Sequence, residues 1–216
     1  MKLSDLHAVN PYMGFNPKRY PVDLHGWGSD APIFDELVER VRPSLIIEVG
    51  TWKGASAIHM ADASKKLGLG TTIVCVDTWL GSVEMWQDQS DETRYGSLGL
   101  KHGYPQLYYQ FLANVVRTGH ADCIIPFPQT SAIAARWFAK RGVQADLIYI
   151  DASHDYDDVL ADLRAYRPLV RLGGVMFGDD RNTFIDVDRA LQQFSKEIGV
   201  KTQGDERFWQ LHKPNV

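Results

Sequence analysis

The sequence has no long apolar run, few cysteines and no excess of positive charge. None of its apolar stretches approaches the roughly 18 residues of a membrane-spanning helix, and the N-terminus lacks a signal-peptide core. Cys75 and Cys123 both lie in apolar strand-like runs, so we expect buried free thiols and no disulfide. A formal net charge of −4 gives no electrostatic case for nucleic acid or an anionic membrane as partner. We therefore expect a cytoplasmic protein.

The remaining composition is that of an ordinary globular protein. Hydrophobic residues make up 44% of the chain and charged residues 23%, which excludes disordered and fibrous classes. At 216 residues, the chain fits an N-terminal arm (1–28) followed by a single domain (29–216). Prolines among aromatic residues predict an irregular arm that packs over the domain or covers a bound ligand. Its expected anchors are Tyr12, Phe15, Tyr20 and Trp27.

Helical and strand-like apolar patterns alternate along the domain. Helices are expected between a cap at Ser29-Asp30 and Pro43, and then over 55–67, 107–118, 132–141, 157–167 and 186–198. Strands are expected over 45–49, 72–76, 121–126, 146–150, 175–178 and 207–212, with Gly173-Gly174 as the turn before the fifth. Near-continuous apolar strands are typical of a sheet covered on both faces. The pattern predicts a Rossmann-like, doubly wound α/β fold, with a mostly parallel sheet and helices on both faces.

Between residues 78 and 105 this periodicity is lost, and aromatic residues lie among glycines and acidic residues. Loops of this length in compact domains are often lids or binding loops, although a polar surface excursion is an equal alternative. Exposed aromatic residues in this segment and in the arm would also suit a homodimer.

The stretch from Leu45 to Ser56 predicts a buried strand, a glycine turn and the start of a helix. Such a turn presents backbone N–H groups and a helix N-terminus to a ligand. Asp77 ends the second strand, where a carboxylate can accept hydrogen bonds from ribose hydroxyls. Because ligands of open α/β sheets bind at the carboxyl ends of the strands, 129–131, 151–154 and 179–180 belong to the same candidate site.

A nicotinamide dinucleotide fits this turn poorly. Its fingerprint requires glycine at Glu48, whose carboxylate would face the pyrophosphate. Asp77 also lies about 27 residues beyond Gly50, farther than the roughly 20 of that fingerprint. A ligand with a ribose and a cationic amino-acid part, without phosphate, fits better. S-adenosylmethionine has this chemistry.

The segment from Glu48 to Ser56 resembles the first motif of class I S-adenosylmethionine-dependent methyltransferases. With Asp77, 151–156 and 173–180, the chain resembles a family related to the macrolide and aminocoumarin sugar O-methyltransferases and to cephalosporin-hydroxylase-type proteins. The resemblance spans about 32–209, most of the chain. It implies a transferase of class EC 2.1.1 that methylates a hydroxyl group of a small acceptor, such as a sugar or another natural product.

The resemblance also implies a cofactor site at the turn and the neighbouring strand ends. Gly50 and Gly54 would let the backbone approach S-adenosylmethionine, Glu48 would serve its methionine end, and Asp77 would hold its ribose. Adenine would lie beside Thr130 and Ser131, at the start of a helix. The implied cofactor-binding set is Glu48, Gly50, Thr51, Trp52, Gly54, Ser56, Asp77, Thr130, Ser131 and Asp151.

In the sugar methyltransferases, residues matching Asp151, Asp179 and Asp180 bind a divalent ion, and a histidine matching His154 is proposed as general base. Three carboxylates at two neighbouring strand ends repel one another unless a proton or a cation intervenes. All-oxygen ligands suit Mg²⁺ better than Zn²⁺. Such an ion would lower the pKa of an acceptor hydroxyl that it holds. We therefore expect Asp151 and His154 to be catalytic. The alternative for the Asp179-Asp180 pair is a helix-capping or ribose-side role without metal. The alternative for His154 is a structural hydrogen bond to a loop backbone.

Two further functions stay open at this point. A same-fold enzyme could perform other chemistry, as the hydroxylase-type naming of some members suggests. A non-catalytic binding protein with a decayed pocket is the second alternative, and intact Gly50, Gly54, Asp77 and Asp151 argue against it.

Overall fold

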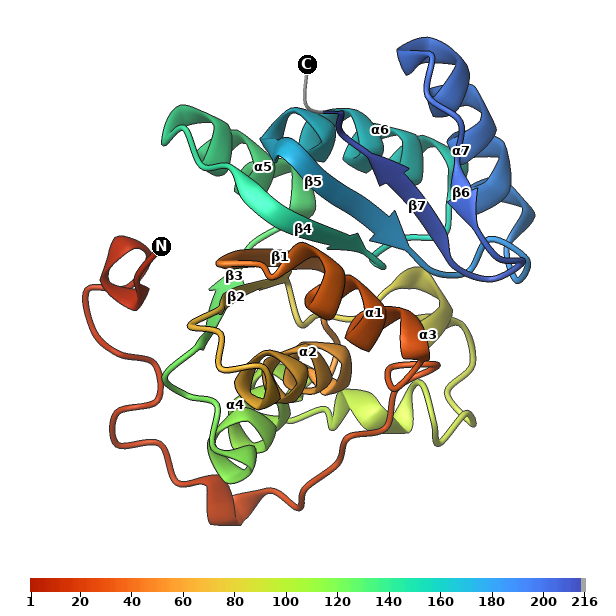
Figure 1. The fold of residues 1–216 in the computed structure, drawn as a ribbon. Helices are drawn as coiled ribbons and strands as arrows, with labels where there is room; N and C mark the ends of the chain where they lie inside the picture. The colour runs from red at the N-terminus through yellow and green to blue at the C-terminus, as the bar shows by residue number, and fades with distance from the viewer. Residues whose placement is uncertain (215–216) are drawn as a thin grey trace.

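The computed structural model describes residues 1–214, and in this range the chain forms a seven-stranded sheet (Figure 1). The strand order is β3-β2-β1-β4-β5-β7-β6. Strands β1 to β5 are parallel, whereas β7 runs antiparallel to β5 and β6. The strands are β1 (Leu45–Val49), β2 (Thr72–Asp77), β3 (Ile124–Pro128), β4 (Ala145–Ile150), β5 (Val170–Gly178), β6 (Gln203–Gly204) and β7 (Trp209–His212). The predicted Rossmann-like, doubly wound α/β fold is confirmed.

Helices cover both faces of this sheet (Figure 1). Helices α1, α2 and α4 pack on one face, and α5, α6 and α7 pack on the other, while α3 lies in the irregular segment after β2. Among the residues described, no helix combines the length and hydrophobicity needed to span a bilayer. The helices are α1 (Pro32–Val41), α2 (Ala55–Lys66), α3 (Val83–Gln87), α4 (Leu107–Thr118), α5 (Ser131–Lys140), α6 (Tyr156–Tyr166) and α7 (Ile185–Ile198).

Each face of the sheet has its own apolar core. In β1, Ile46 packs with residues of α1, α2 and α4, whereas Ile47 packs with residues of α5, α6 and α7. This alternation follows from the two-residue repeat of a strand. Cys75 is buried in β2, Cys123 is half-buried just before β3, and both thiols are free, as predicted.

The start of α1 differs from the prediction. Its N-cap is Ala31, and no side chain caps the helix. The N–H of Ala31 donates to the carbonyl of Gly28 at 3.0 Å, so Ser29 and Asp30 are the central residues of a turn. Pro32 then begins the helix at a position where its missing N–H costs nothing.

Three strand starts also differ by two residues or more, and β7 begins at Trp209 and not at 207. Strand β3 begins at Ile124, because the N–H groups of Cys123 and Ile124 donate to the carbonyl of His120 and close a turn there. Strand β5 begins at Val170, so Gly173-Gly174 lies within it and does not precede it. The pairing of β5 with β4 shifts register along this part of the strand, which makes the glycine pair a bulge-like irregularity.

The N-terminal segment 1–28 lies against the domain. The Tyr12 hydroxyl is buried and donates to the carbonyl of Ile124 at 2.9 Å. Phe15 and Tyr20 stack with Tyr109 of α4 at centroid distances of 6.4 and 6.3 Å. The fourth expected anchor, Trp27, lies with its ring centroid 5.8 Å from that of Trp52 but stays 46% exposed.

A buried amide fixes the end of this arm beside the glycine turn. Asn114 of α4 donates to the carbonyls of Asp23 (2.6 Å) and Lys53 (2.8 Å), and accepts from the Asp23 N–H (3.0 Å). The buried Lys53 ammonium lies 2.6 Å from the Asp23 carboxylate. Arm, turn and α4 are thus joined by one network, in which each buried polar group has a partner.

We expect Asn114→Ala to lower the free energy of unfolding by several kcal/mol, because each buried group left unpaired costs about 1–3 kcal/mol. Urea unfolding measures the change. Arg117→Ala is the control, since Arg117 of α4 makes an exposed bond to the same arm, at the carbonyl of Tyr20. Equal stability of the two variants would contradict the network.

Candidate functional site

The carboxyl ends of β1, β2, β4 and β5 open into a cavity of about 590 Å³. This volume falls within the roughly 300–1,000 Å³ of small-molecule sites. Most of the residues predicted from the strand ends line it: Gly50, Thr51, Trp52, Ser56, Asp77, Gln129, Thr130, Ser131, Asp151, His154 and Asp180. Glu48, Gly54 and Asp179 are not among the lining residues.

The glycine turn follows β1, and other segments of the protein pack closely against its two glycines. Gly50 has a φ of +81°, and a Cβ there would overlap the carbonyl oxygen of Asp151, which follows β4. Gly54 has a φ of +85° and is the N-cap of α2. A Cβ at Gly54 would lie 2.9 Å from the ring of Phe111. Packing of the turn therefore requires both glycines, and Gly54 faces α4 and not the cavity.

Asp77, at the end of β2, holds this turn in place. Its Oδ2 accepts from the N–H groups of Thr51 (2.9 Å) and Trp52 (3.0 Å), and its Oδ1 accepts from Trp79 N–H (2.7 Å). The pKa of Asp77 is raised above its usual value, because burial outweighs the lowering effect of these backbone donors. Trp52 and Trp79 both have left-handed backbones, with φ of +52° and +54°, which costs free energy that the surrounding contacts must supply.

Glu48 lies beneath the turn and is fully buried. Its carboxylate accepts from the hydroxyl groups of Thr51 (2.8 Å) and Ser56 and from the Cys75 thiol (3.5 Å). Burial raises the pKa of Glu48 to about 7. Because Glu48 is two residues after Ile46, it points toward the same face of the sheet. Glu48 does not line the cavity, and its place at the methionine end of a cofactor stays a prediction.

Two hydroxyl residues after β3 form a further wall. Thr130 is the N-cap of α5, as predicted, and its hydroxyl accepts from Ile133 N–H at 3.3 Å. Ser131 follows as the first residue of that helix, and its carbonyl accepts from the Tyr166 hydroxyl at 2.9 Å.

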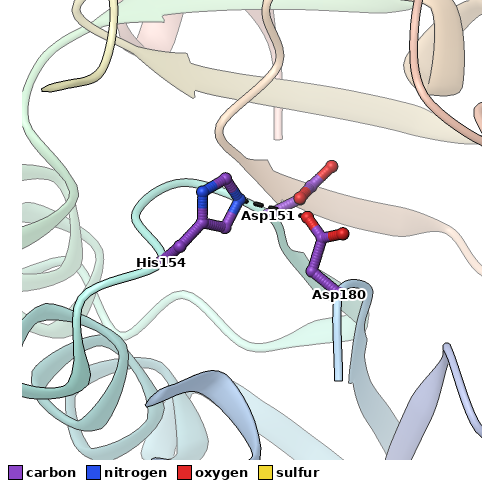
Figure 2. Close-up of side chains that lie close together, drawn as sticks. All are labelled: Asp151, His154 and Asp180. Carbon is purple, nitrogen blue, oxygen red and sulfur yellow. Dashed lines mark ion pairs between the residues drawn. The ribbon is translucent and has the colours of Figure 1, made fainter. Parts of the chain in front are cut away.

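Asp151, His154 and Asp180 form a cluster at the ends of β4 and β5 (Figure 2). Each residue offers one possible metal-ligand atom, and these three atoms lie within 4.8 Å of one another. His154 Nε2 is 3.1 Å from Asp180 Oδ2, and the Tyr149 hydroxyl donates to Asp151 Oδ2 at 2.9 Å. Asp180 has a φ of +66°, a conformation that is uncommon outside glycine.

The cluster shifts the proton affinities of its members. Burial, together with the charges of Asp180 and Asp179, raises the pKa of Asp151 to about 7. Burial alone would lower the pKa of His154. The carboxylates of Asp180, Asp151 and Glu84 have the larger effect and raise this pKa to about 9. Burial raises the pKa of Asp180, yet its contacts with His154 bring it below its usual value. The predicted repulsion between carboxylates is thus relieved here by the imidazolium.

Asp179 was expected to bind a divalent ion together with Asp180. In the structure its carboxylate is buried against Arg207. Arg207 donates to both oxygens, each at 2.7 Å, and its Nη2 also donates to the Trp27 carbonyl. The backbone at Asp180 is left-handed, and the two neighbouring carboxylates have different partners: Arg207 for Asp179 and His154 for Asp180. Sequence alone predicts only a strand around Arg207, so nothing in it identifies this pair.

Three further cavity residues carry no clear sequence signal. Glu84 of α3 lies in the irregular segment, with its Oε1 3.2 Å from His154 Nδ1. Phe184 stacks on the His154 ring, with centroids 4.0 Å apart. Trp27 lines the cavity from the arm, and the Arg94 guanidinium lies 5.4 Å from its ring centroid. Of the three, only Trp27 was singled out from sequence, as an anchor of an arm that could cover a bound ligand.

We expect Gly50→Ala to destabilise the protein by about 1–3 kcal/mol from backbone strain plus the clash with the Asp151 carbonyl. Gly68→Ala is a matched control, because Gly68 also has a positive φ (+67°) but no atom lies within 4 Å of its added Cβ. Chemical unfolding of both variants gives the comparison. A Gly50 variant as stable as the Gly68 variant would show that the close approach is unimportant.

The chain has a family match and several structural relatives. Residues 47–181 match the model of a family described as a methyltransferase domain. A comparison with curated proteins finds no match. Cofactor-bound Rv0187 from MTB is 17% identical, with a TM-score of 0.64 over 89% of this chain and 83% of that one.

Two other solved structures share the fold at low identity. An O-methyltransferase from Bacillus cereus in complex with SAH is 16% identical, with a TM-score of 0.57 over 98% of this chain and 90% of that one. CalS11, a TDP-rhamnose 3'-O-methyltransferase, is 19% identical, with a TM-score of 0.58 over 83% and 77% of the two chains. The family match covers more than half of the sequence and runs from the glycine turn to the acidic cluster. The chain therefore belongs to this family of methyltransferases.

Proposed function

We propose that this methyltransferase moves the methyl group of S-adenosylmethionine to a hydroxyl group of a small acceptor, such as a sugar or another natural product, with the help of a divalent cation. One observation carries this proposal. The glycine turn with Asp77 and the cluster of Asp151, His154 and Asp180 line one cavity. A donor held at the turn and an acceptor held at the cluster would meet there, and alignment of the two reactants supplies much of the acceleration in such transfers.

The cofactor side of the cavity fits S-adenosylmethionine chemically. Asp77 Oδ1 accepts one backbone bond in the structure and keeps a free lone pair for a ribose hydroxyl. The carboxylates of Asp77 and Asp151 would favour the positive ammonium and sulfonium groups. Thr130 and Ser131 line the part of the cavity beside β3 and would flank adenine. Glu48 and Gly54 contribute by shaping the turn and not by contact.

The acidic cluster fits a divalent cation such as Mg²⁺ or Mn²⁺. Asp151 and Asp180 offer carboxylate oxygens, which suit both ions, and the ring nitrogen of His154 favours Mn²⁺ over Mg²⁺. The Arg207 pair occupies both oxygens of Asp179, so we leave Asp179 out of the proposed ligand set. A bound cation would lower the pKa of an acceptor hydroxyl.

Asp151 is the group that would take the acceptor proton, and His154 must lose its own proton to bind the cation. Burial and the charges of Asp180 and Asp179 raise the pKa of Asp151 to about 7, which offsets the lowering that a bound cation would cause. His154 holds its proton because Asp180 attracts it. A cation at Asp180 would remove that attraction, so the imidazole would release its proton and offer its lone pair to the cation.

For the cofactor, we expect calorimetry to show micromolar binding of S-adenosylmethionine. Asp77→Asn should weaken it by about 10–100-fold, the cost of a charge-assisted hydrogen bond of about 1.5–3 kcal/mol. Unfolding measurements on the same variant separate loss of the ribose contact from collapse of the turn. Wild-type protein that binds no cofactor, with or without Mg²⁺, would contradict the proposal.

For the metal, we expect chelation to abolish methyl transfer to a panel of hydroxylated sugars and phenols. Asp180→Ala should reduce transfer by more than the roughly 10–100-fold typical of residues that only orient a ligand. Asp186→Ala is the control, since Asp186 is an exposed carboxylate of α7 paired with Arg189. Transfer that persists after chelation and in the Asp180 variant would reject the metal but leave the cofactor assignment intact.

A further inference from the structure

We propose that Glu84 is a positioning residue that orients the His154 imidazole, so that its Nε2 is presented to the Asp151–Asp180 cluster. This inference rests on the proposed function, because it assigns Glu84 a part in the same cation site. Glu84 lies in the irregular segment after β2, far in sequence from the strand ends that carry the cluster.

The His154 ring is held from three sides by three different segments. Glu84 Oε1 of α3 lies 3.2 Å from Nδ1, and Asp180 Oδ2 after β5 lies 3.1 Å from Nε2. Phe184, just before α7, stacks on the ring face at 4.0 Å with an interplanar angle of 4°. Phe184 fixes the plane of the ring, and the two carboxylates fix its rotation within that plane.

The chemistry of imidazole gives the Glu84 contact its meaning. A neutral imidazole carries one N–H and one nitrogen lone pair, and the hydrogen bond made by one nitrogen decides which nitrogen keeps the lone pair. A carboxylate at Nδ1 keeps the hydrogen there. With a cation at Asp180, the lone pair would then lie on Nε2 and face that cation. Metal-bound histidines generally have such a carboxylate or carbonyl partner at the other nitrogen.

The fold supports the position of Glu84 independently of His154. Helix α3 lies between two buried anchors of the irregular segment, Trp79 and Leu98. Within it, Trp86 Nε1 donates to the Leu80 carbonyl at 2.9 Å, and the Trp86 ring packs edge-on against Tyr95. The Glu84 side chain is 28% exposed, and the cavity is the environment it faces. The irregular segment therefore supplies a group to the cluster in addition to forming a wall.

A direct test uses Mn²⁺ alone as the probe, with affinity measured from the electron paramagnetic resonance signal of the free ion. We expect Glu84→Leu to weaken Mn²⁺ binding by about 10–100-fold, the usual cost of removing a group that orients a metal ligand. Glu84→Gln should lose less, because its amide oxygen still accepts from Nδ1–H. Glu92→Leu is the control, since Glu92 is exposed in the same segment and does not line the cavity.

A double-mutant cycle shows whether Glu84 acts through His154. In a His154→Ala background, Glu84→Leu should cause no additional loss of Mn²⁺ affinity. Circular dichroism and calorimetry with S-adenosylmethionine check that each variant is folded, and Glu84→Gln replaces Glu84→Leu in the cycle if the latter fails to fold.

Three results would overturn the inference, and the first two leave the proposed function intact. Wild-type affinity in Glu84→Leu, or a full loss that persists without His154, would reduce Glu84 to an anchor of α3. Absence of Mn²⁺ binding by the wild type would remove the cation site altogether, together with the role of Glu84 in it. Binding of S-adenosylmethionine is measured separately and tests the cofactor half alone.

Discussion

The close approach of Gly50 to the carbonyl of Asp151 is the contact on which the site depends. It joins the turn after β1 to the loop after β4, and these are neighbouring strands in the centre of the sheet. At this point the chain order of the strands reverses, since β2 and β3 lie on one side of β1 and β4 and β5 lie on the other. The two loops therefore diverge above the sheet, and the cavity lies between them.

Charge within the cavity is arranged by burial as much as by pairing. Glu48 is buried, Asp77 and Asp151 are half-buried, and desolvation raises the pKa of all three carboxyl groups. Hydroxyl, thiol or backbone donors satisfy the first two. Asp179 is instead neutralised by a guanidinium, which removes one negative charge from beside Asp180. The remaining negative charge is concentrated where Asp151 and Asp180 meet His154. That concentration distinguishes this corner from the rest of the wall.

Strand ends were the part of the site that sequence could predict. A parallel sheet brings its carboxyl ends to one edge, so Asp77, Thr130, Asp151 and Asp180 could be grouped from the strand pattern alone. The direction of a side chain at a strand end is harder to predict. Glu48 follows the face of Ile46 and is buried beneath the turn, and Asp179 turns away from Asp180 toward Arg207.

The positions of residues in irregular segments could not be predicted, for a different reason. Glu84, Phe184 and Trp27 reach the cavity through turns and short helices whose path is set by tertiary contacts. The start of α1 and the glycine pair in β5 differ from prediction for the same cause: a turn and a register shift, decided by neighbouring segments, override the local signals. Periodicity therefore specified the layers of the fold, whereas the lining from loops needed the structure.

The network around Asn114 affects how a ligand would enter. It fastens the end of the arm to α4 and the glycine turn, so the wall that carries Trp27 is already ordered before anything binds. A wall of this kind costs a ligand little conformational entropy, and more of the contact energy remains as affinity. The entry of a ligand then requires no ordering of this wall.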